Sequence, residues 1–443
     1  MDWLLRTMSG YADRPAMVVG ESVYTYASML DNCREWADTI REHGIRPGEV
    51  VSLEGDYSPS VCGAIMALLA NRNIIVPLSD NVQHRHDELM DIAQADRSFV
   101  FGATGPEIRT YARSGHSGLL AEFIREDKPG LILFTSGTTG VPKAILHDFT
   151  RFVERYKTPR DTMRTLTFLL FDHIGGLNTM FHTLANGGTI VAPTSRTAAA
   201  ICALIEKHRI ELLPTSPSFL NLLLLSGAYG KYDLSSLRII TYGTEVMPDS
   251  ILQAAYRTFP GIQLRQTYGL SELGILRAKS RASGSPWLKL GGEGVETRIV
   301  DGMLHIRSDT GMRGYLNAPS PFDEQGWFNT LDEVLTDGDY IRILGRRSDV
   351  INVGGRKVFP VEVEDVLLQM PEIADAAVRG EPNPLLGRVV AAVVNLHEPL
   401  DPKTLKARIR SFCTGKLENY QIPVKIEIRQ EHLFTERYKK MRK

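Results

Sequence analysis

Residues 134–143 read Phe-Thr-Ser-Gly-Thr-Thr-Gly-Val-Pro-Lys and follow the apolar run Leu131-Ile132-Leu133. This order predicts a buried strand that ends in a loop for an anion. Glycines let backbone N–H groups approach a phosphate closely, while hydroxyls and a lysine add donors and positive charge. The predicted ligands of this anion are Thr135, Ser136, Gly137, Thr138, Thr139, Gly140 and the cation Lys143. A Walker loop would end in Gly-Lys-Ser/Thr, whereas Pro142 precedes this lysine, so the pattern favours a polyphosphate site outside the P-loop NTPases.

The composition indicates a soluble globular protein that binds small molecules. The 443 residues are 43% hydrophobic and 23% charged, and their length predicts two or three domains. A formal charge of −1 gives no reason to expect a nucleic acid or an anionic membrane as partner. The longest apolar runs fall well short of the roughly 20 residues of a membrane helix, and the first residues, with Asp2 and Arg6, do not resemble a secretory signal. We therefore expect a cytoplasmic location.

The cysteines and histidines give no sign of a metal site. The four cysteines lack a C-x-x-C pattern, and the eleven histidines form no H-x-x-x-H or H-E-x-x-H pattern. We expect the cysteines to be reduced core residues.

Short β-type runs alternate with helical periodicity over most of the chain. Strands are predicted at Val50 to Leu53 and Ile74 to Val76, and helices at Leu30 to Glu42 and Ser58 to Ala70. The alternation continues after the phosphate loop. Further strands are predicted at Leu166 to Leu170, Thr189 to Val191, Glu211 to Leu213 and Leu237 to Thr241, and further helices at Gly176 to Ala185 and Ala198 to His208. This rhythm predicts an α/β fold whose large N-terminal domain has parallel sheets with helices on both faces.

A domain boundary is predicted near Gly345-Arg346-Arg347-Ser348, a short polar segment. Upstream, Trp327 to Leu344 is rich in strand signals. Downstream, a helix at Val361 to Met370 and strands at Asp375 to Val378 and Val389 to Leu396 predict a small α+β unit. We therefore expect a large domain at 1–346 and a small domain at 347–443.

Two further clusters offer groups for a nucleotide. Gln266 to Glu272 combines an aromatic ring for a base, a glycine for close approach and a carboxylate that could hold Mg²⁺ against a polyphosphate. Tyr242-Gly243-Thr244-Glu245 follows a predicted buried strand, and ligands bind at the carboxyl ends of parallel strands. Both clusters favour a nucleotide site beside the phosphate loop.

From about Tyr11 to its end, the chain resembles the acyl-adenylate-forming enzymes: acyl-CoA synthetases, aryl-acid ligases and nonribosomal adenylation domains. The motifs that carry the resemblance are Thr-Ser-Gly-Thr-Thr-Gly-x-Pro-Lys, the Tyr268 cluster and Gly326-Trp327-Phe328-Asn329-Thr330-Leu331-Asp332. The resemblance implies that Tyr268 stacks on adenine, that Glu272 binds the metal, and that Asp332 and Arg346 contact the ribose and phosphate. The other nucleotide-binding residues that it implies are Gly243, Thr244, Glu245, Gly269, Ser271 and Tyr340.

The C-terminal segment Thr435 to Arg442 is similar to the family's Thr-x-x-Gly-Lys-x-x-Arg. By this resemblance Lys439 is the catalytic lysine that bridges the carboxylate and the α-phosphate, with Lys440 as the alternative register. Tyr438 stands in place of the motif's glycine, as Leu331 does in the Gly326 motif. The resemblance also implies that the small domain is mobile and turns about Ser348 or Asp349.

The function implied is ATP-dependent adenylation of a small carboxylic acid, followed by thioester formation on CoA or on the phosphopantetheine of an acyl carrier protein. Because two anions must meet, the catalytic equipment is cations and oriented donors. Lys143 and a Mg²⁺ on Glu272 would hold the leaving pyrophosphate, and Lys439 would serve the attacking oxygen.

The acid pocket is expected to be lined by His173, Gly176, Ser216, Tyr242 and Gly243. The neighbouring Asp172 leaves an alternative open, because amino-acid-activating relatives use an aspartate to pair the substrate ammonium. A third possibility is a relative that binds adenylate without catalysis. We favour an aryl or acyl acid without an α-amine, since Gly175-Gly176 and the apolar run Leu222 to Leu225 suit an apolar acid.

Overall fold

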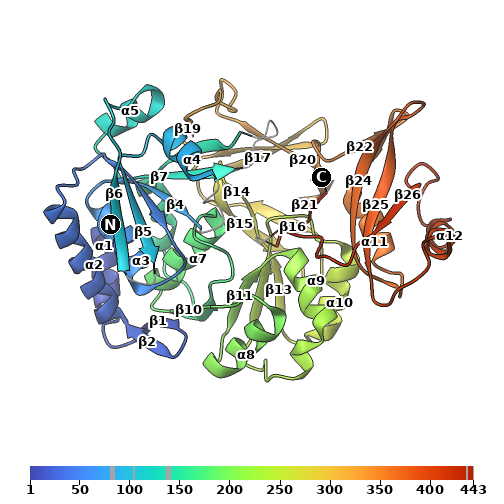
Figure 1. The fold of residues 1–443 in the computed structure, drawn as a ribbon, viewed down its shortest axis with the longest axis horizontal. Helices are drawn as coiled ribbons and strands as arrows, with labels where there is room; N and C mark the ends of the chain where they lie inside the picture. Colours follow the sequence, from blue (N-terminus) through green and yellow to red (C-terminus); the bar gives the residue numbers. More distant parts are fainter. Residues whose placement is uncertain (80–84, 103–104, 136–140, 436–437, 443) are drawn as a thin grey trace.

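The computed structural model describes residues 1–443 except 80–84, 103–104, 136–140, 436–437 and 443. Its described residues form three seven-stranded sheets and one five-stranded sheet (Figure 1). The first sheet has the order β13(Gln263–Gln266)-β12(Ile239–Tyr242)-β11(Leu212–Thr215)-β9(Arg164–Leu166)-β10(Thr189–Ala192)-β1(Pro15–Val19)-β2(Ser22–Thr25). The second has the order β19(Gly314–Tyr315)-β8(Lys143–Asp148)-β7(Gly130–Thr135)-β4(Ile74–Leu78)-β3(Val50–Glu54)-β5(Arg97–Gly102)-β6(Gly105–Thr110). In both sheets the central strands are parallel.

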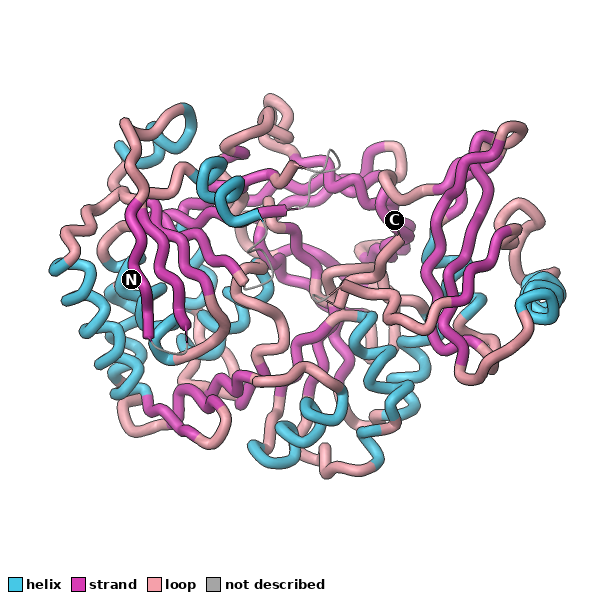
Figure 2. Tube along the Cα trace, in the orientation of Figure 1, coloured by secondary structure: helices cyan, strands magenta, loops and turns pink. Residues whose placement is uncertain are grey.

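Helices cover both faces of these two sheets (Figure 2), as the sequence predicted. One core joins the facing sides of the two sheets through α1(Asp2–Ser9), α2(Tyr26–Glu42), α3(Pro59–Ala70), α6(Phe149–Glu154) and α7(Ile174–Ala185). On the outer side of the first sheet lie α8(Ala198–His208), α9(Pro217–Ser226) and α10(Asp249–Thr258), and on the outer side of the second lie α4(His86–Ala93) and α5(Gly118–Arg125). The large domain therefore has alternating layers of helices and sheets.

The helix starts follow local capping rules. Thr25, Ser58, Thr197 and Ser216 each accept a hydrogen bond from a backbone N–H three residues later, which caps α2, α3, α8 and α9. The sequence misplaced one strand. The prediction at Leu166 to Leu170 was wrong, because β9 ends at Leu166 and the apolar Phe168 that follows packs on Phe219 with ring centroids 4.2 Å apart. An apolar run alone does not distinguish a buried turn from a strand.

The third sheet is antiparallel. Its order is β14(Tyr268–Leu270)-β15(Gly274–Ser280)-β16(Leu288–Gly291)-β21(Tyr340–Arg346)-β20(Phe328–Asp337)-β18(Met303–Ser308)-β17(Val295–Val300). The strand-rich stretch Trp327 to Leu344 is confirmed as the β20–β21 hairpin. The four cysteines are free and buried, as expected. No helix in the described part of the chain is long and apolar enough to cross a membrane.

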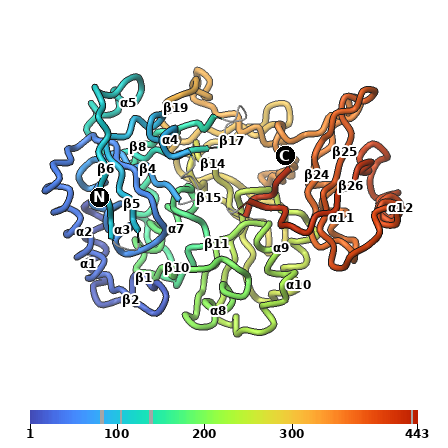
Figure 3. Tube along the Cα trace, in the orientation of Figure 1, coloured from blue at the N-terminus to red at the C-terminus, as the bar shows by residue number. Residues whose placement is uncertain are grey.

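The small C-terminal unit is the fourth sheet with two helices. Its order is β23(Arg356–Val358)-β22(Ile351–Val353)-β25(Gly387–Leu396)-β24(Ile373–Asn383), and β26(Lys425–Ile428) also pairs with β25. One core packs α11(Pro360–Leu367) and α12(Pro402–Cys413) on this sheet. The third sheet ends at Arg346 and the fourth begins at Ile351, while the division into 1–346 and 347–443 stays a prediction. After β26 the chain runs back over the large domain, so its end lies near the centre of the molecule (Figure 3).

Candidate active site

A cavity of about 2040 Å³ lies where the three large sheets, the small domain and the C-terminal tail meet. Ordinary ligand pockets measure roughly 300–1,000 Å³, so this one has room for more than one ligand. Ten of the residues predicted for the site line it: Thr135, Lys143, His173, Gly243, Thr244, Gly269, Ser271, Glu272, Arg346 and Lys439. The predicted phosphate ligands Ser136, Gly137, Thr138, Thr139 and Gly140 lie outside the described residues. Groups far apart in sequence are thus brought to one space.

Glu272 and Lys143 are joined by a tyrosine that the sequence did not single out. The Tyr315 hydroxyl donates to Glu272 Oε1 at 2.9 Å, and Lys143 Nζ lies 5.0 Å from the centroid of the same ring. Burial, followed by the Glu272 charge, raises the pKa of Tyr315, so the phenol remains a donor at neutral pH. Tyr315 reaches this place because β19 pairs with β8, which no local sequence signal announces. It sets the spacing between the predicted metal ligand and the predicted phosphate cation.

A buried carboxylate links Tyr268 to Arg346. The Tyr268 hydroxyl donates to Asp332 Oδ2 at 2.6 Å, and Arg346 Nε lies 3.4 Å from Asp332 Oδ1. Asp332 and Arg346 are directly opposite each other in the β20–β21 register. Burial raises the pKa of Asp332, and the Arg346 charge opposes that rise. Tyr268 and Asp332 lie behind the cavity wall, and Gly269 and Arg346 form its surface.

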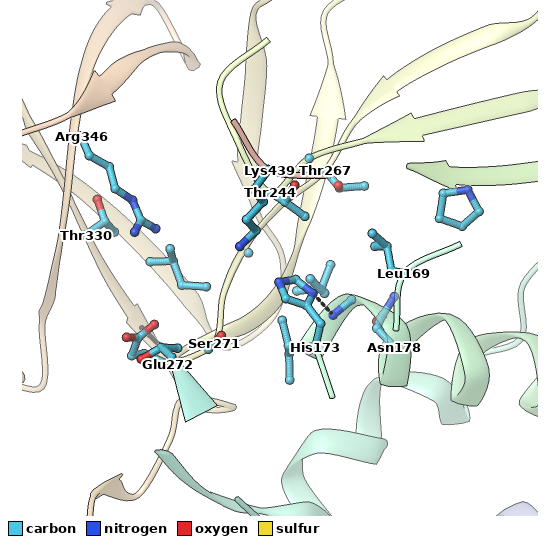
Figure 4. A pocket seen from close by; sticks show the side chains of 18 of the residues that line it. Leu169, His173, Asn178, Thr244, Thr267, Ser271, Glu272, Thr330, Arg346 and Lys439 are labelled. Atoms are coloured by element: carbon cyan, nitrogen blue, oxygen red, sulfur yellow. Dashed lines mark hydrogen bonds between the residues drawn. The ribbon is translucent and has the colours of Figure 1, made fainter. Parts of the chain in front are cut away.

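His173 stands between the two ends of the cavity (Figure 4). It is the N-cap of α7, and its Nδ1 accepts a hydrogen bond from the Gly175 N–H at 3.1 Å. A ring nitrogen that accepts carries no proton, so a neutral His173 holds its proton on Nε2. On one side of it Figure 4 shows Glu272 and Arg346, and on the other Asn178 and Leu169. The ring thus lies between Glu272 and Arg346 on one side and the uncharged Asn178 and Leu169 on the other.

The C-terminal tail delivers Lys439 to the same space. Figure 4 shows its side chain directed between Glu272 and His173. The neighbouring Lys440 is engaged elsewhere, because its ammonium pairs with Asp375 and both side chains are less than a tenth exposed. Arg442 forms a two-pronged pair with the buried Glu364, with distances of 2.8 and 2.7 Å. These neighbours hold the tail and favour Lys439 over Lys440 as the catalytic residue.

Besides Tyr268 and Asp332, five predicted residues are not brought to the cavity wall. Ser216 and Glu245 instead hold the tail: Ser216 Oγ donates to the Tyr438 carbonyl at 2.8 Å, and Glu245 Oε2 accepts from the Lys440 N–H at 2.9 Å. Tyr242 points to the core, because side chains alternate along a strand and Thr241 takes the cavity face.

Gly176 and Tyr340 complete this set. A Cβ at Gly176 would lie 1.9 Å from the Leu170 carbonyl oxygen, so this glycine serves close packing. Tyr340 begins the strand that ends at Arg346, about 20 Å away at the rise of an extended strand. Its ring lies under the Arg281 guanidinium, 4.5 Å from the centroid. Tyr340 therefore lies away from the cavity.

Asp172 also lies off the cavity wall. It is buried, and its Oδ2 accepts a hydrogen bond from the Ser79 hydroxyl at 2.6 Å. No group of three or more His, Cys, Asp or Glu that could hold a metal ion occurs among the described residues. The carboxylate of Glu272 suits a Mg²⁺ that takes its other ligands from phosphates and water.

The two domains enclose a cavity that brings together the cations Lys143 and Arg346, the carboxylate of Glu272 and the tail residue Lys439. This arrangement is that of an adenylate-forming ligase. Comparison with protein families agrees: AMP-binding enzymes match residues 4–113 and 110–316, and their C-terminal domain matches residues 362–438. The chain therefore belongs to the AMP-binding enzyme family. It is an acid–thiol ligase that forms an acyl-AMP intermediate.

Similar proteins cover nearly the whole chain. An indoleacetate–CoA ligase of Aromatoleum aromaticum is 31% identical over 96% of this chain and 93% of its own length. A 2-succinylbenzoate–CoA ligase of Bacillus licheniformis is 25% identical over 95% of this chain and 94% of its own. The crystal structure of the anthranilate CoA ligase AuaEII with anthranoyl-AMP has the same fold, with a TM-score of 0.85, 21% identity and coverage of 100% of this chain and 95% of that chain.

Proposed function

We propose that this protein uses ATP and Mg²⁺ to adenylate a carboxylic acid that lacks an α-ammonium group, and then transfers the acyl group to CoA. One observation supports the proposal above the others. Lys439 and His173 lie between the charged end of the cavity, at Glu272 and Arg346, and the end at Asn178 and Leu169 (Figure 4). A carboxylate at this junction faces the phosphates on one side and leaves its acyl part in the other end.

In the first step an oxygen of the carboxylate bonds to the α-phosphorus of ATP, and the bond from that phosphorus to the bridging oxygen breaks. Pyrophosphate leaves with the electron pair. Lys439 lowers the repulsion between the two anions, while Lys143 holds the departing phosphates, which is electrostatic stabilisation in a partly buried site. Mg²⁺ bound to Glu272 would neutralise charge on the phosphates. In the second step the CoA thiol gives up its proton to solvent and its sulfur bonds to the acyl carbon. The bond from that carbon to the phosphate oxygen breaks, and AMP leaves with the electron pair.

The position of Asp172 supports an acid without an α-amine. An aspartate that pairs a substrate ammonium must present its carboxylate to the pocket, but Asp172 is buried behind the wall and accepts from Ser79. The similarity to CoA ligases along nearly the full chain supports CoA over a carrier protein as the acceptor.

Acid-dependent exchange of labelled pyrophosphate into ATP tests the first step, and thioester detection with CoA and with a phosphopantetheinylated carrier protein tests the second. We expect exchange with at least one acid and transfer to CoA. No exchange with any acid of a broad panel would refute the proposal. Exchange only with amino acids, abolished by Asp172→Ala, would establish the amino-acid-activating alternative.

The lysine assignment has its own test. Lys439→Ala should lower the exchange rate by about a hundredfold or more, since electrostatic groups of this kind contribute about 10²–10³ in rate. Lys403→Ala, at an exposed position on α12 of the same small domain, is the control and should leave the rate unchanged. An unaltered exchange rate in Lys439→Ala would show that Lys439 is not the catalytic lysine, whereas binding of ATP without exchange in the wild type would favour a relative that binds adenylate without catalysis.

A further inference from the structure

The cavity continues beyond His173 along the whole of α7. The helix contributes Ile174, Gly175, Asn178, Thr179, His182 and Thr183 to its wall. They form two series of residues four apart, 174, 178, 182 and 175, 179, 183, and this spacing places them on one side of the helix. At 1.5 Å per residue, the wall from His173 to Thr183 is about 15 Å long. A compact aromatic acid at His173 would fill only the first part of it.

The first sheet supplies the other wall. Leu212 and Pro214 on β11 and Ile239 and Thr241 on β12 line the cavity, while the intervening Leu213 and Ile240 belong to the core under α8–α10. Side chains of a strand alternate between faces, so one complete face of these strands borders the cavity. The space along α7 is thus a channel with a mainly polar wall on the helix. The sheet wall has an apolar strip at Leu212, Pro214 and Ile239, beside the polar Thr165, Thr215 and Thr241.

Two threonines of this channel have unused hydrogen-bonding capacity. Thr183 and Thr215 are 3% and 2% exposed, and neither Oγ1 atom has a hydrogen-bond partner among the described residues. A buried hydroxyl without a partner costs roughly 1–3 kcal/mol, so such groups need a reason. By contrast, the Thr179 hydroxyl on the same helix donates to the Gly175 carbonyl at 2.8 Å.

His182 lies beside Thr183 on the channel wall. Burial lowers the pKa of His182, and Arg160 lowers it further while Asp161 raises it. The imidazole is therefore neutral at pH 7 and offers one donor and one acceptor instead of a positive charge. Arg160 and Asp161 border the cavity beside it with opposite charges, and Arg265 of β13 also lines the cavity.

We infer that the acid is elongated and apolar along one side, with an uncharged keto or hydroxyl oxygen near its far end that Thr183 and His182 bind. This rests on the proposed function, which places the carboxylate at Lys439 and His173. An apolar flank fits the strand wall, and a distal oxygen would satisfy the hydroxyl that the protein leaves without a partner. A site built to hydrogen-bond a substrate group discriminates against analogues that lack it.

The wild-type enzyme tests this with four acids in the pyrophosphate exchange assay: 4′-hydroxybiphenyl-4-ylacetate, biphenyl-4-ylacetate, 4′-carboxybiphenyl-4-ylacetate and benzoate. We expect the hydroxylated biphenyl acid to exceed the unsubstituted one about tenfold in kcat/KM, and benzoate to be the poorest. Equal or better exchange with benzoate would overturn the elongated shape. A preference for the unsubstituted acid or for the second carboxylate would overturn the uncharged distal oxygen.

Thr183→Val keeps the shape of the side chain and removes only the hydroxyl. We expect it to reduce the hydroxylated-to-unsubstituted ratio of kcat/KM about tenfold, toward one. Ser52→Ala is the matched control, because Ser52 Oγ is also buried without a partner among the described residues but does not line the cavity. Its ratio should equal that of the wild type.

An unchanged ratio in Thr183→Val would refute the role of Thr183. His182→Phe gives a second measurement if the first variant does not fold, and it too should lower the ratio, because it removes the other group that binds the distal oxygen. Exchange that occurs with short acids but shows no preference for length refutes this inference and leaves the proposed function intact. Absence of exchange with every acid refutes the proposed function itself.

Discussion

Leu331 lines the cavity and Tyr438 directly precedes the cavity-lining Lys439. Both stand where the motifs that this sequence resembles have glycine, yet their surroundings differ. Both adopt a left-handed backbone, with φ of +59° and +51°. Outside glycine such a conformation costs roughly 1–2 kcal/mol. Both residues therefore hold a conformation that glycine would adopt without this cost.

Only Tyr438 has contacts that offset this cost. Its ring centroid lies 5.0 to 5.3 Å from those of Phe168, Phe219 and Phe434, and its hydroxyl donates to the Arg196 carbonyl at 2.7 Å. The Leu331 side chain is 45% exposed. Tyr438 therefore anchors the tail through aromatic packing that compensates for its backbone strain. Leu331 has the same strain but no buried contacts that compensate for it.

The largest effect is expected where the tail next to Tyr438 meets the small domain. Asp375→Ala leaves the Lys440 ammonium buried without its carboxylate, which costs roughly 3–5 kcal/mol when one partner of a buried pair is removed. We expect faster hydrogen exchange of the tail amides around 438–442. The double variant with Lys440→Ala should recover part of the loss, and full additivity of the two changes would contradict the pairing.

His147 is a buried residue that holds Ser271, a residue of the cavity wall. Its Nε2 bonds to the Ser271 carbonyl at 2.6 Å, and burial lowers the pKa of His147 to about 4. The unfolded chain takes up this proton near pH 6.5, whereas the folded chain takes it up only near pH 4. The free energy of unfolding should therefore decrease as the pH is lowered from 6.5 to 4. The contribution is about 3 kcal/mol and is fully present above pH 6.5.

Chemical unfolding at a series of pH values measures this effect. His147→Gln removes the titrating group, so its stability should depend less on pH between 6.5 and 4 than that of the wild type. Identical pH profiles would show that His147 is not the group responsible.

Replacing Tyr438 tests whether packing at this residue positions Lys439. Tyr438→Ala should lower the pyrophosphate exchange rate about a hundredfold, because displacement of a catalytic group by about 1 Å can cost that much. Tyr438→Phe keeps the ring and loses only the Arg196 hydrogen bond, so a loss of no more than about tenfold is expected. The dissociation constant of a non-hydrolysable acyl-adenylate analogue reports binding without Lys439 chemistry and should change far less. Equal losses in both assays would indicate general destabilisation.

The smallest effect belongs to Leu331. Leu331→Gly should raise the free energy of unfolding by about 1 kcal/mol, because relief of the left-handed backbone exceeds the entropic cost of glycine, which is roughly 0.5–1 kcal/mol. Leu335→Gly is the control, since Leu335 is similarly exposed on the same strand, β20, but does not have a positive φ. That variant should be less stable than the wild type.

Much of the fold and part of the site could be predicted from the sequence. Periodicity located α3, α8 and the central parallel strands, and the motifs named Lys143, Glu272 and Lys439. Tyr340 was wrongly assigned to the nucleotide site because it is close to Arg346 in sequence. The two residues are at opposite ends of β21, so they are far apart in the structure. Tyr315, His182 and Thr183 were missed because no motif contains them.

The sequence by itself determined the family, the alternating large domain and the chemical groups needed for adenylation, since these depend on local order and composition. Only the tertiary structure decided which groups meet. It showed Lys440 held by Asp375, Asp172 turned away behind Ser79, and a channel along α7. The physical reason is that such contacts depend on which face of a strand or helix a residue occupies and on what packs against that face.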